Sequence, residues 1–231
     1  MKKIEFHHHN GCTKYLLLFS MLYCTILLLS GVYVYRPVPF SDYQFSAACL
    51  IYPLSYSCND IVCEMYGYHY SRRLIWFGMI CVFTFAFLSK FINNIPYPTQ
   101  WHDQASFITV LGSYLRLSFA GLASMLIGEF TNTIALSKWK KIAKGRHFWL
   151  RSVSSTSVGA LMDTGIEYVI AFSGVVSDTK LIQMLLMAYL FRVIYAVMIS
   201  APSSFIVMIL KNVENSDGVE PVSYNPFRLD N

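Results

Sequence analysis

Long apolar segments separated by short polar connections constrain the fold of this chain more than any other feature. We expect membrane-spanning helices at about residues 15–35, 43–62, 74–92, 105–137, 155–176 and 180–210. Roughly 20 apolar residues are needed to cross the hydrocarbon core of a bilayer, and most of these segments reach that length. The second segment contains Pro53 and has a short apolar part, which fits either a kinked crossing or a re-entrant helix. The pattern predicts an all-α fold, a polytopic six-helix transmembrane bundle.

The composition excludes a soluble or disordered protein. Of the 231 residues 55% are hydrophobic and only 13% are charged, whereas soluble domains carry about 25% charged residues. A net charge of +5 indicates a nucleic-acid partner only when basic residues gather on a solvated face, and we expect no such partner. The sequence contains no cysteine and histidine spacing typical of a metal site, no nucleophile elbow and no phosphate-binding loop. We therefore expect neither a metal nor a cofactor, and no enzyme activity.

The basic residues predict the orientation in the membrane. Thirteen of the 18 fall on one side of the predicted helices: Lys2, Lys3, Lys14, Arg72, Arg73, Lys138, Lys140, Lys141, Lys144, Arg146, Arg151, Lys211 and Arg228. Only Arg36, Lys90 and Lys180 fall on the other side. Because Lys and Arg are enriched in cytoplasmic loops, we expect a membrane domain over residues 15–211 and cytoplasmic tails at 1–14 and 212–231.

Acidic residues in the second and fourth predicted helices need a partner in lipid. Asp60 and Glu64 lie four residues apart and share a helix face, so they repel unless a proton, Arg72 and Arg73, or a ligand compensates them. A solvated cluster at the membrane interface is an equally good interpretation. In the fourth segment a stripe of small residues, best explained by helix packing, recurs every four positions: Ala120, Ser124, Gly128 and Asn132. Glu129 lies near the same face as Asn132, and packing alone does not require this carboxylate.

The fifth segment gives the strongest functional signal. Four small or acidic residues recur every four positions along one face: Ser155, Gly159, Asp163 and Glu167. A structural role for the two acids requires a buried cation, for which Arg192 and Arg116 are the candidates. We favour instead a ligand or ion pathway, because buried ion pairs are weak evidence for a structural purpose.

Four segments resemble the queuosine precursor transporter family, bacterial inner-membrane proteins also called vitamin-uptake-transporter-like. The similarity covers about residues 46–214, and it is carried by the segments YPLSYSCNDIVCEMYGYHYSRRLIWFG, GEFTNTIALSKWKK, WLRSVSSTSVGALMDT and FRVIYAVMISAP. The resemblance implies an architecture similar to the substrate-binding components of energy-coupling-factor transporters. It also implies uptake of a 7-deazaguanine such as 7-cyano-7-deazaguanine, which is salvaged for tRNA modification.

A guanine-like edge offers an N1 hydrogen and an exocyclic amine, which one carboxylate can accept together. We expect Asp163 or Glu129 to be that carboxylate and Asn132 to donate to the base carbonyl. The full set of predicted substrate-binding residues is Asp60, Glu64, Glu129, Asn132, Asp163, Glu167 and Arg192. A secondary carrier is the leading hypothesis. One alternative is the binding component of an ATP-driven transporter, which would dock onto its ATPase module through the small-residue stripe. The other is a membrane enzyme that uses Asp163 and Glu167. A homodimer remains open.

Overall fold

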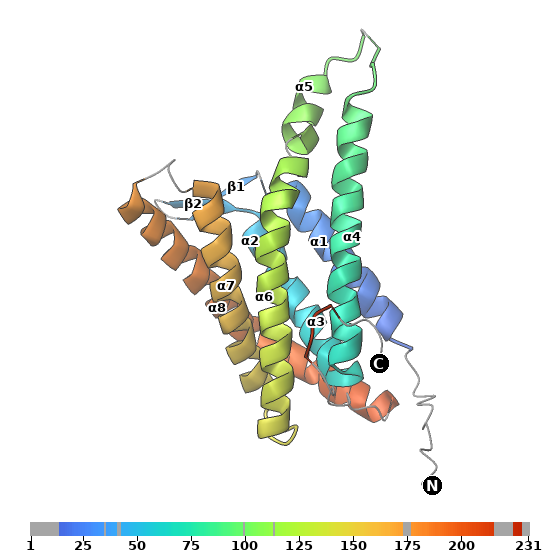
Figure 1. Ribbon diagram of the computed structural model, residues 1–231, viewed down its shortest axis with the longest axis vertical. Coiled ribbons are helices and arrows are strands. Elements are labelled where there is room, and N and C mark those ends of the chain that lie inside the picture. Colours follow the sequence, from blue (N-terminus) through green and yellow to red (C-terminus); the bar gives the residue numbers. More distant parts are fainter. Residues whose placement is uncertain are drawn as a thin grey trace.

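The computed structural model describes residues 14–34, 36–40, 43–98, 100–112, 114–172, 177–214 and 224–227. This part of the chain is all-α apart from one short hairpin (Figure 1). Three helices are long and apolar enough to cross a membrane: α1 (Leu16–Tyr33), α4 (Tyr68–Asn93) and α8 (Asp178–Glu214). Their outward faces expose large apolar side chains, among them Leu17, Phe77, Phe87, Ile194 and Phe205. Such faces suit lipid rather than water as the surrounding solvent.

The other predicted crossings correspond to α6 (Tyr114–Ile142), α7 (Phe148–Phe172) and the segment that ends with α3 (Pro53–Tyr66). Helices α6 and α7 have 29 and 25 residues, which is enough to span a bilayer at about 1.5 Å per residue. They are less apolar than α1, α4 and α8 because their polar residues face the interior of the protein. Six crossings therefore stay a prediction.

The predicted helical start of the second segment at Tyr43 is wrong. Strands β1 (Pro37–Phe40) and β2 (Tyr43–Ser46) pair in antiparallel register there, with Pro37 opposite Ser46. Pro37 and Pro39 cannot donate to a helix ladder, whereas an edge strand tolerates them. The chain becomes helical only in α2 (Ala48–Ile51), and α3 follows after Tyr52, whose backbone is also helical. Pro53 stands at the start of α3, where its missing N–H is tolerated.

Helix α3 lies at the centre of the molecule. It packs against α1, α4, α6 and α8, and 11 of its 14 residues are buried. It ends at Gly67, whose φ of 89° and ψ of 168° are accessible almost only to glycine. Because α4 starts at the next residue, α3 and α4 form an angle around a single residue. This connection presents both faces of α3 to neighbouring helices.

Helices α6 and α7 lie side by side and approach closely at two glycines (Figure 1). A Cβ atom placed on Gly128 would lie 2.5 Å from Cβ of Asp163 and 3.1 Å from the carbonyl oxygen of Gly159. A Cβ atom on Gly159 would lie 2.7 Å from Cβ of Asn132. The small-residue stripe therefore serves helix packing at Gly128 and Asn132, as the sequence predicts. The side chain of Ala120 lies outside the described residues.

The fourth predicted segment is not one regular helix. It consists of α5 (Gln104–Phe107), a π-helical turn η1 (Ile108–Gly112) and α6. Helix α6 extends five residues beyond the predicted end at residue 137. Similarly, α7 begins at Phe148, seven residues before the predicted start. Between them the chain turns within five residues, and Gly145 and two of its neighbours adopt positive φ angles.

One end of the molecule gathers the start of α1, the α6–α7 turn and the end of α8 (Figure 1). The backbone N–H of Tyr15 donates to Glu214 across 3.2 Å, which joins the first and last helices. Two parts of the predicted tail are described at this end. Helix α8 continues to Glu214, and residues 224–227 lie against α4, where Tyr68, Arg72 and Trp76 donate to backbone oxygens of Tyr224, Asn225 and Pro226.

Candidate functional site

The predicted site residues lie along the interfaces of α3, α6, α7 and α8. Six of the seven are buried, each with at most 7% of its surface exposed: Asp60, Glu64, Glu129, Asn132, Asp163 and Arg192. Glu167 is the exception, with 34% of its side chain exposed. These residues fall into four separate groups of contacts rather than one.

Arg192 on α8 binds both acidic residues of α7. Its guanidinium donates from Nη1 to Asp163 and from Nη2 to Oε2 of Glu167 at 2.9 Å. It also lies over the ring of Tyr52, 5.4 Å from the ring centre. The shared face of Asp163 and Glu167 is therefore as predicted, and Arg192 is their cation. The side chain of Arg116, the other candidate cation, lies outside the described residues.

Glu129 on α6 has only uncharged partners. Its two oxygens accept hydrogen bonds from Oγ of Ser55 at 3.1 Å and from Nδ2 of Asn59 at 3.0 Å, both on α3. Asn59 also donates to Thr133 at 2.8 Å and accepts from Ser71 on α4. Among the residues that the structure describes, no Lys or Arg forms an ion pair with Glu129. A fully buried carboxylate thus lies in the protein interior with no counterion among the described side chains.

Asp60 on α3 likewise has neutral partners. It accepts from Nδ2 of Asn132 at 2.7 Å, from Oγ of Ser152, and from Oγ1 of Thr156 at 3.3 Å. From the sequence we expect the Asn132 amide to donate to a carbonyl of the substrate base. In the structure this amide donates to Asp60 instead. Glu129 binds Asn59 and Asn132 binds Asp60, the next residue of α3. The two α6 residues therefore share one side of the helix but take part in different groups of contacts.

Glu64 joins four helices at the basic end of the molecule. Arg151 on α7 donates twice to its carboxylate, at 3.1 and 3.2 Å, and Lys211 on α8 donates at 2.8 Å. Lys140 on α6 lies 3.8 Å from the same carboxylate and donates to the backbone oxygen of Glu64 at 2.9 Å. Compensation by Arg72 and Arg73 is therefore a wrong prediction for this carboxylate. The turn at Gly67 directs Arg72 to Asn225 and His69 instead.

Several buried hydroxyl groups near these carboxylates have no hydrogen-bond partner within the described residues: Tyr23, Tyr52, Tyr56 and Thr164. The rings of Tyr52 and Tyr56 meet edge to face with centres 5.7 Å apart. Buried hydroxyl groups are normally paired, so an unpaired group requires an explanation. Sequence reasoning did not single out the three tyrosines because tyrosine is common throughout this chain, with 16 examples.

Sequence reasoning also omitted the neutral partners of the carboxylates. Ser55 and Asn59 stand four residues apart on α3, and Ser152 and Thr156 repeat that spacing on α7. Because this spacing places each pair on one helix face, it could have indicated that these side chains are hydrogen-bond partners of the carboxylates. Within the described ranges, no three His, Cys, Asp or Glu side chains converge as a metal site would require. The arrangement can instead accept hydrogen bonds from a neutral ligand.

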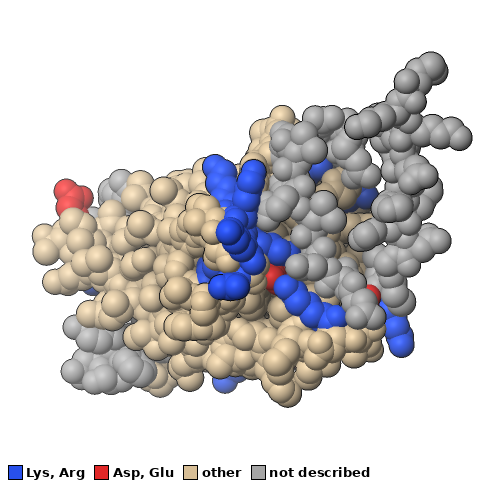
Figure 2. Space-filling model, turned by 90° about the horizontal axis from the view of Figure 1, so that it is seen from below, with Lys and Arg blue, Asp and Glu red and all other residues tan. Residues whose placement is uncertain are grey.

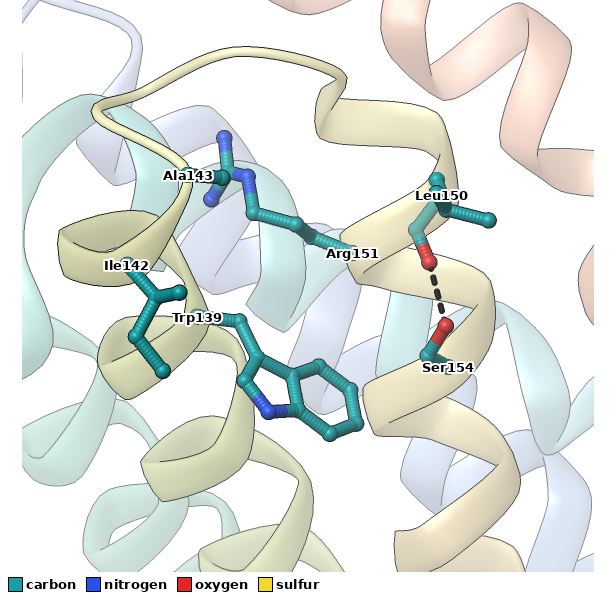
Figure 3. A pocket seen from close by; sticks show the side chains of 6 residues that line it. All are labelled: Trp139, Ile142, Ala143, Leu150, Arg151 and Ser154. Carbon is teal, nitrogen blue, oxygen red and sulfur yellow. Dashed lines mark hydrogen bonds between the residues drawn. The ribbon is translucent and has the colours of Figure 1, made fainter.

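A pocket of about 240 Å³ lies beside the α6–α7 turn (Figure 3). It is lined by Trp139, Ile142, Ala143, Leu150, Arg151 and Ser154. The hydroxyl of Ser154 turns back to the carbonyl of Leu150 at 2.7 Å, and Arg151 is committed to Glu64. The pocket is thus mainly apolar and lies at the basic end, away from Glu129 and Asp163.

Comparison with known proteins identifies the family. A family model described as "Putative vitamin uptake transporter" matches residues 46–207. A curated protein of Bacillus subtilis (strain 168), named "Probable queuosine precursor transporter", is 24% identical over 158 residues, which are 68% of this chain and 68% of the relative. No solved structure matches significantly. These findings confirm the resemblance carried by the sequence motifs.

The match and the apolar helices establish the class of protein. The chain is an integral membrane protein and a transporter rather than an enzyme, which removes the hypothesis of a membrane enzyme based on Asp163 and Glu167. With 162 consecutive positions matched by the family model, the chain belongs to the vitamin uptake transporter family.

Proposed function

We propose that this transporter imports a queuosine precursor, 7-cyano-7-deazaguanine or a related 7-deazapurine, across the bacterial inner membrane. The name of the Bacillus subtilis relative supports the substrate class. The observation that carries the proposal is the buried Glu129 carboxylate, which has neutral partners and no counterion among the described residues. A charge in that position is costly in lipid unless a ligand or proton interacts with it.

The proposed arrangement in the membrane has six crossings within residues 15–211. Basic side chains gather at the end of the molecule that is seen from below in Figure 2. That end holds Lys14, the α6–α7 turn with its lysines and arginines, and Lys211. The positive-inside rule assigns it to the cytoplasm. Both tails, residues 1–14 and 212–231, then lie on the cytoplasmic side.

The proposed substrate site comprises all seven residues predicted from the sequence. Asp60 and Glu129 accept hydrogen bonds from uncharged side chains, including Asn132, whereas Glu64, Asp163, Glu167 and Arg192 are joined in ion pairs. A 7-deazapurine is neutral and planar, so a site without excess positive charge suits it. The adjacent tyrosine rings offer surfaces on which such a ring can stack.

We propose a secondary carrier rather than the binding component of an ATP-driven transporter. An ATPase module would need small-residue docking faces on an exposed helix. The two best-placed members of the stripe, Gly128 and Asn132, are buried against α7 instead. Alternating access through rearrangement of helices around a central site then accounts for transport.

Uptake by intact cells tests this function. Cells that cannot synthesise queuosine precursors should accumulate labelled 7-cyano-7-deazaguanine, 7-aminomethyl-7-deazaguanine or queuine only when they express this chain. We expect Asp163→Asn to abolish uptake while the protein remains inserted, because the change removes half of the charge that holds Arg192. Asp178→Asn, at the exposed start of α8, should transport like the wild type. Equal accumulation with and without the chain for all three compounds would contradict the proposal.

A further inference from the structure

Within the described residues, Glu129 and Asp60 are the two buried carboxylates of the site that form no ion pair with Lys or Arg, and Glu129 accepts fewer hydrogen bonds than Asp60. Each of its oxygens accepts one bond, and both donors lie on α3. Asp60, by comparison, accepts three bonds from two helices. Asp163 is bound by the Arg192 guanidinium, which already neutralises its charge. A ligand with two adjacent N–H donors would therefore gain most from Glu129.

The hydroxyl of Tyr56 lies beside Gly128, the residue before Glu129. It is 2.8 Å from the point that a Cβ atom on Gly128 would occupy, and Cβ of Asp163 is 2.5 Å from the same point. Tyr56 is therefore located between α6 and α7, next to the residue that precedes Glu129. Its side chain is only 2% exposed, and its hydroxyl lies near that of Tyr52 without a hydrogen bond of regular geometry in the described part of the chain.

Two further phenols extend this group. Tyr23 on α1 is fully buried and Tyr52 precedes α3, and both hydroxyls are buried without a partner among described residues. Tyr23 interacts electrostatically with Glu129, whereas Tyr52 and Tyr56 interact with both Asp163 and Glu129. Buried hydroxyls that form no regular hydrogen bond within the described residues, and that lie near two carboxylates, are complementary to a polar ligand that can donate and accept hydrogen bonds.

We infer that Glu129, rather than Asp163, accepts the N1 hydrogen and the exocyclic amine of the deazaguanine ring, and that the Tyr56 hydroxyl donates to an acceptor on the same ring. The inference rests on the proposed function and specifies its site. Binding supplies donors to the carboxylate and an acceptor to the phenol, while Arg192 keeps Asp163 and Glu167 in place.

Titration of the purified full-length protein with two ligands tests this assignment. The first ligand is 7-cyano-7-deazaguanine, and the second is the same ring without the exocyclic amine. The wild type should bind the first about tenfold or more tightly than the second, since the lost bond involves a charged acceptor. Glu129→Gln should weaken binding of the first ligand by about tenfold or more and largely remove this preference, because the two changes delete the same interaction.

Matched variants separate a recognition role from a folding defect. Tyr56→Phe should weaken binding of both ligands several-fold and preserve the preference between them. Glu129→Asp keeps the charge and should retain the preference at lower affinity. Glu214→Gln and Tyr66→Phe remove a carboxylate charge and a hydroxyl at the basic end of the protein, where these two groups bind each other, and should bind like the wild type.

Two results would overturn the inference in different ways. If Glu129→Gln keeps the preference and Asp163→Asn loses it, Asp163 is the acceptor and the proposed function stands. If the wild type binds neither ligand nor any other queuosine precursor, the inference and the proposed function fail together.

Discussion

Loss of Arg192 should cost considerable stability. Its guanidinium holds Asp163 and Glu167, and Asp163 is almost fully buried. Removal of one partner from a buried ion pair leaves an uncompensated charge, which typically costs about 3–5 kcal/mol. Arg192→Ala should therefore lower the free energy of unfolding by about 3 kcal/mol or more, measured by thermal or denaturant unfolding in detergent.

Two further variants check the cause of that loss. Lys180→Ala removes an exposed cation near the start of the same helix and should unfold like the wild type. Asp163→Asn combined with Glu167→Gln in the Arg192→Ala background should recover much of the lost stability, because the two negative charges that Arg192 compensates are then removed with it. Unchanged unfolding of Arg192→Ala would show that Asp163 and Glu167 do not depend on it.

For individual residues, the sequence predicted which side chains are unusual in a membrane helix but not which side chains contact each other. Acidic residues stand out in apolar segments, and a four-residue spacing correctly placed Asp163 and Glu167 on one face. The partners of Glu64 are 76, 87 and 147 positions away in sequence. Helical periodicity contains no information about such distant contacts, so Lys140, Arg151 and Lys211 were not identified as its partners.

The close approach of α6 and α7 gives a prediction for whole helices. A methyl group on Gly128 would overlap Asp163 and press on Gly159, so the helices must separate. Overpacking of this kind costs about 1–3 kcal/mol. Gly128→Ala should lower the free energy of unfolding by that amount and reduce uptake. Gly121→Ala, on the same helix with no atom within 4 Å of the new methyl group, should be neutral or slightly stabilising, since alanine favours helix. Equal effects of the two substitutions would contradict close packing at Gly128.

Apolar length predicted where helices occur better than where they begin and end. Lipid exposure requires apolar residues, so α1, α4 and α8 are evident from composition alone. Helices α6 and α7 extend beyond the membrane-length estimate because basic residues also form helix readily outside lipid. The hairpin of β1 and β2 was missed because aromatic residues suit strands as well as membrane helices.

For the whole molecule, the orientation is the property that a direct experiment can settle. Reporter fusions after Ile95, Lys144 and Ser177 sample three successive connections between helices. With six crossings and cytoplasmic tails, alkaline phosphatase should be active at Ile95 and Ser177, and green fluorescent protein should be fluorescent at Lys144. The physical reason is the basic α6–α7 turn, which is retained in the cytoplasm. Phosphatase activity at Lys144 would contradict this topology.

The contacts of residues 224–227 with α4 have a practical consequence for anyone who shortens the chain. The polar end looks dispensable in the sequence, yet a stop codon before Tyr224 would deprive three side chains, Tyr68, Arg72 and Trp76, of their acceptors at 3.0, 2.9 and 2.9 Å. Trimming at the carboxyl terminus for crystallisation or purification therefore carries a stability risk that the hydropathy profile does not reveal.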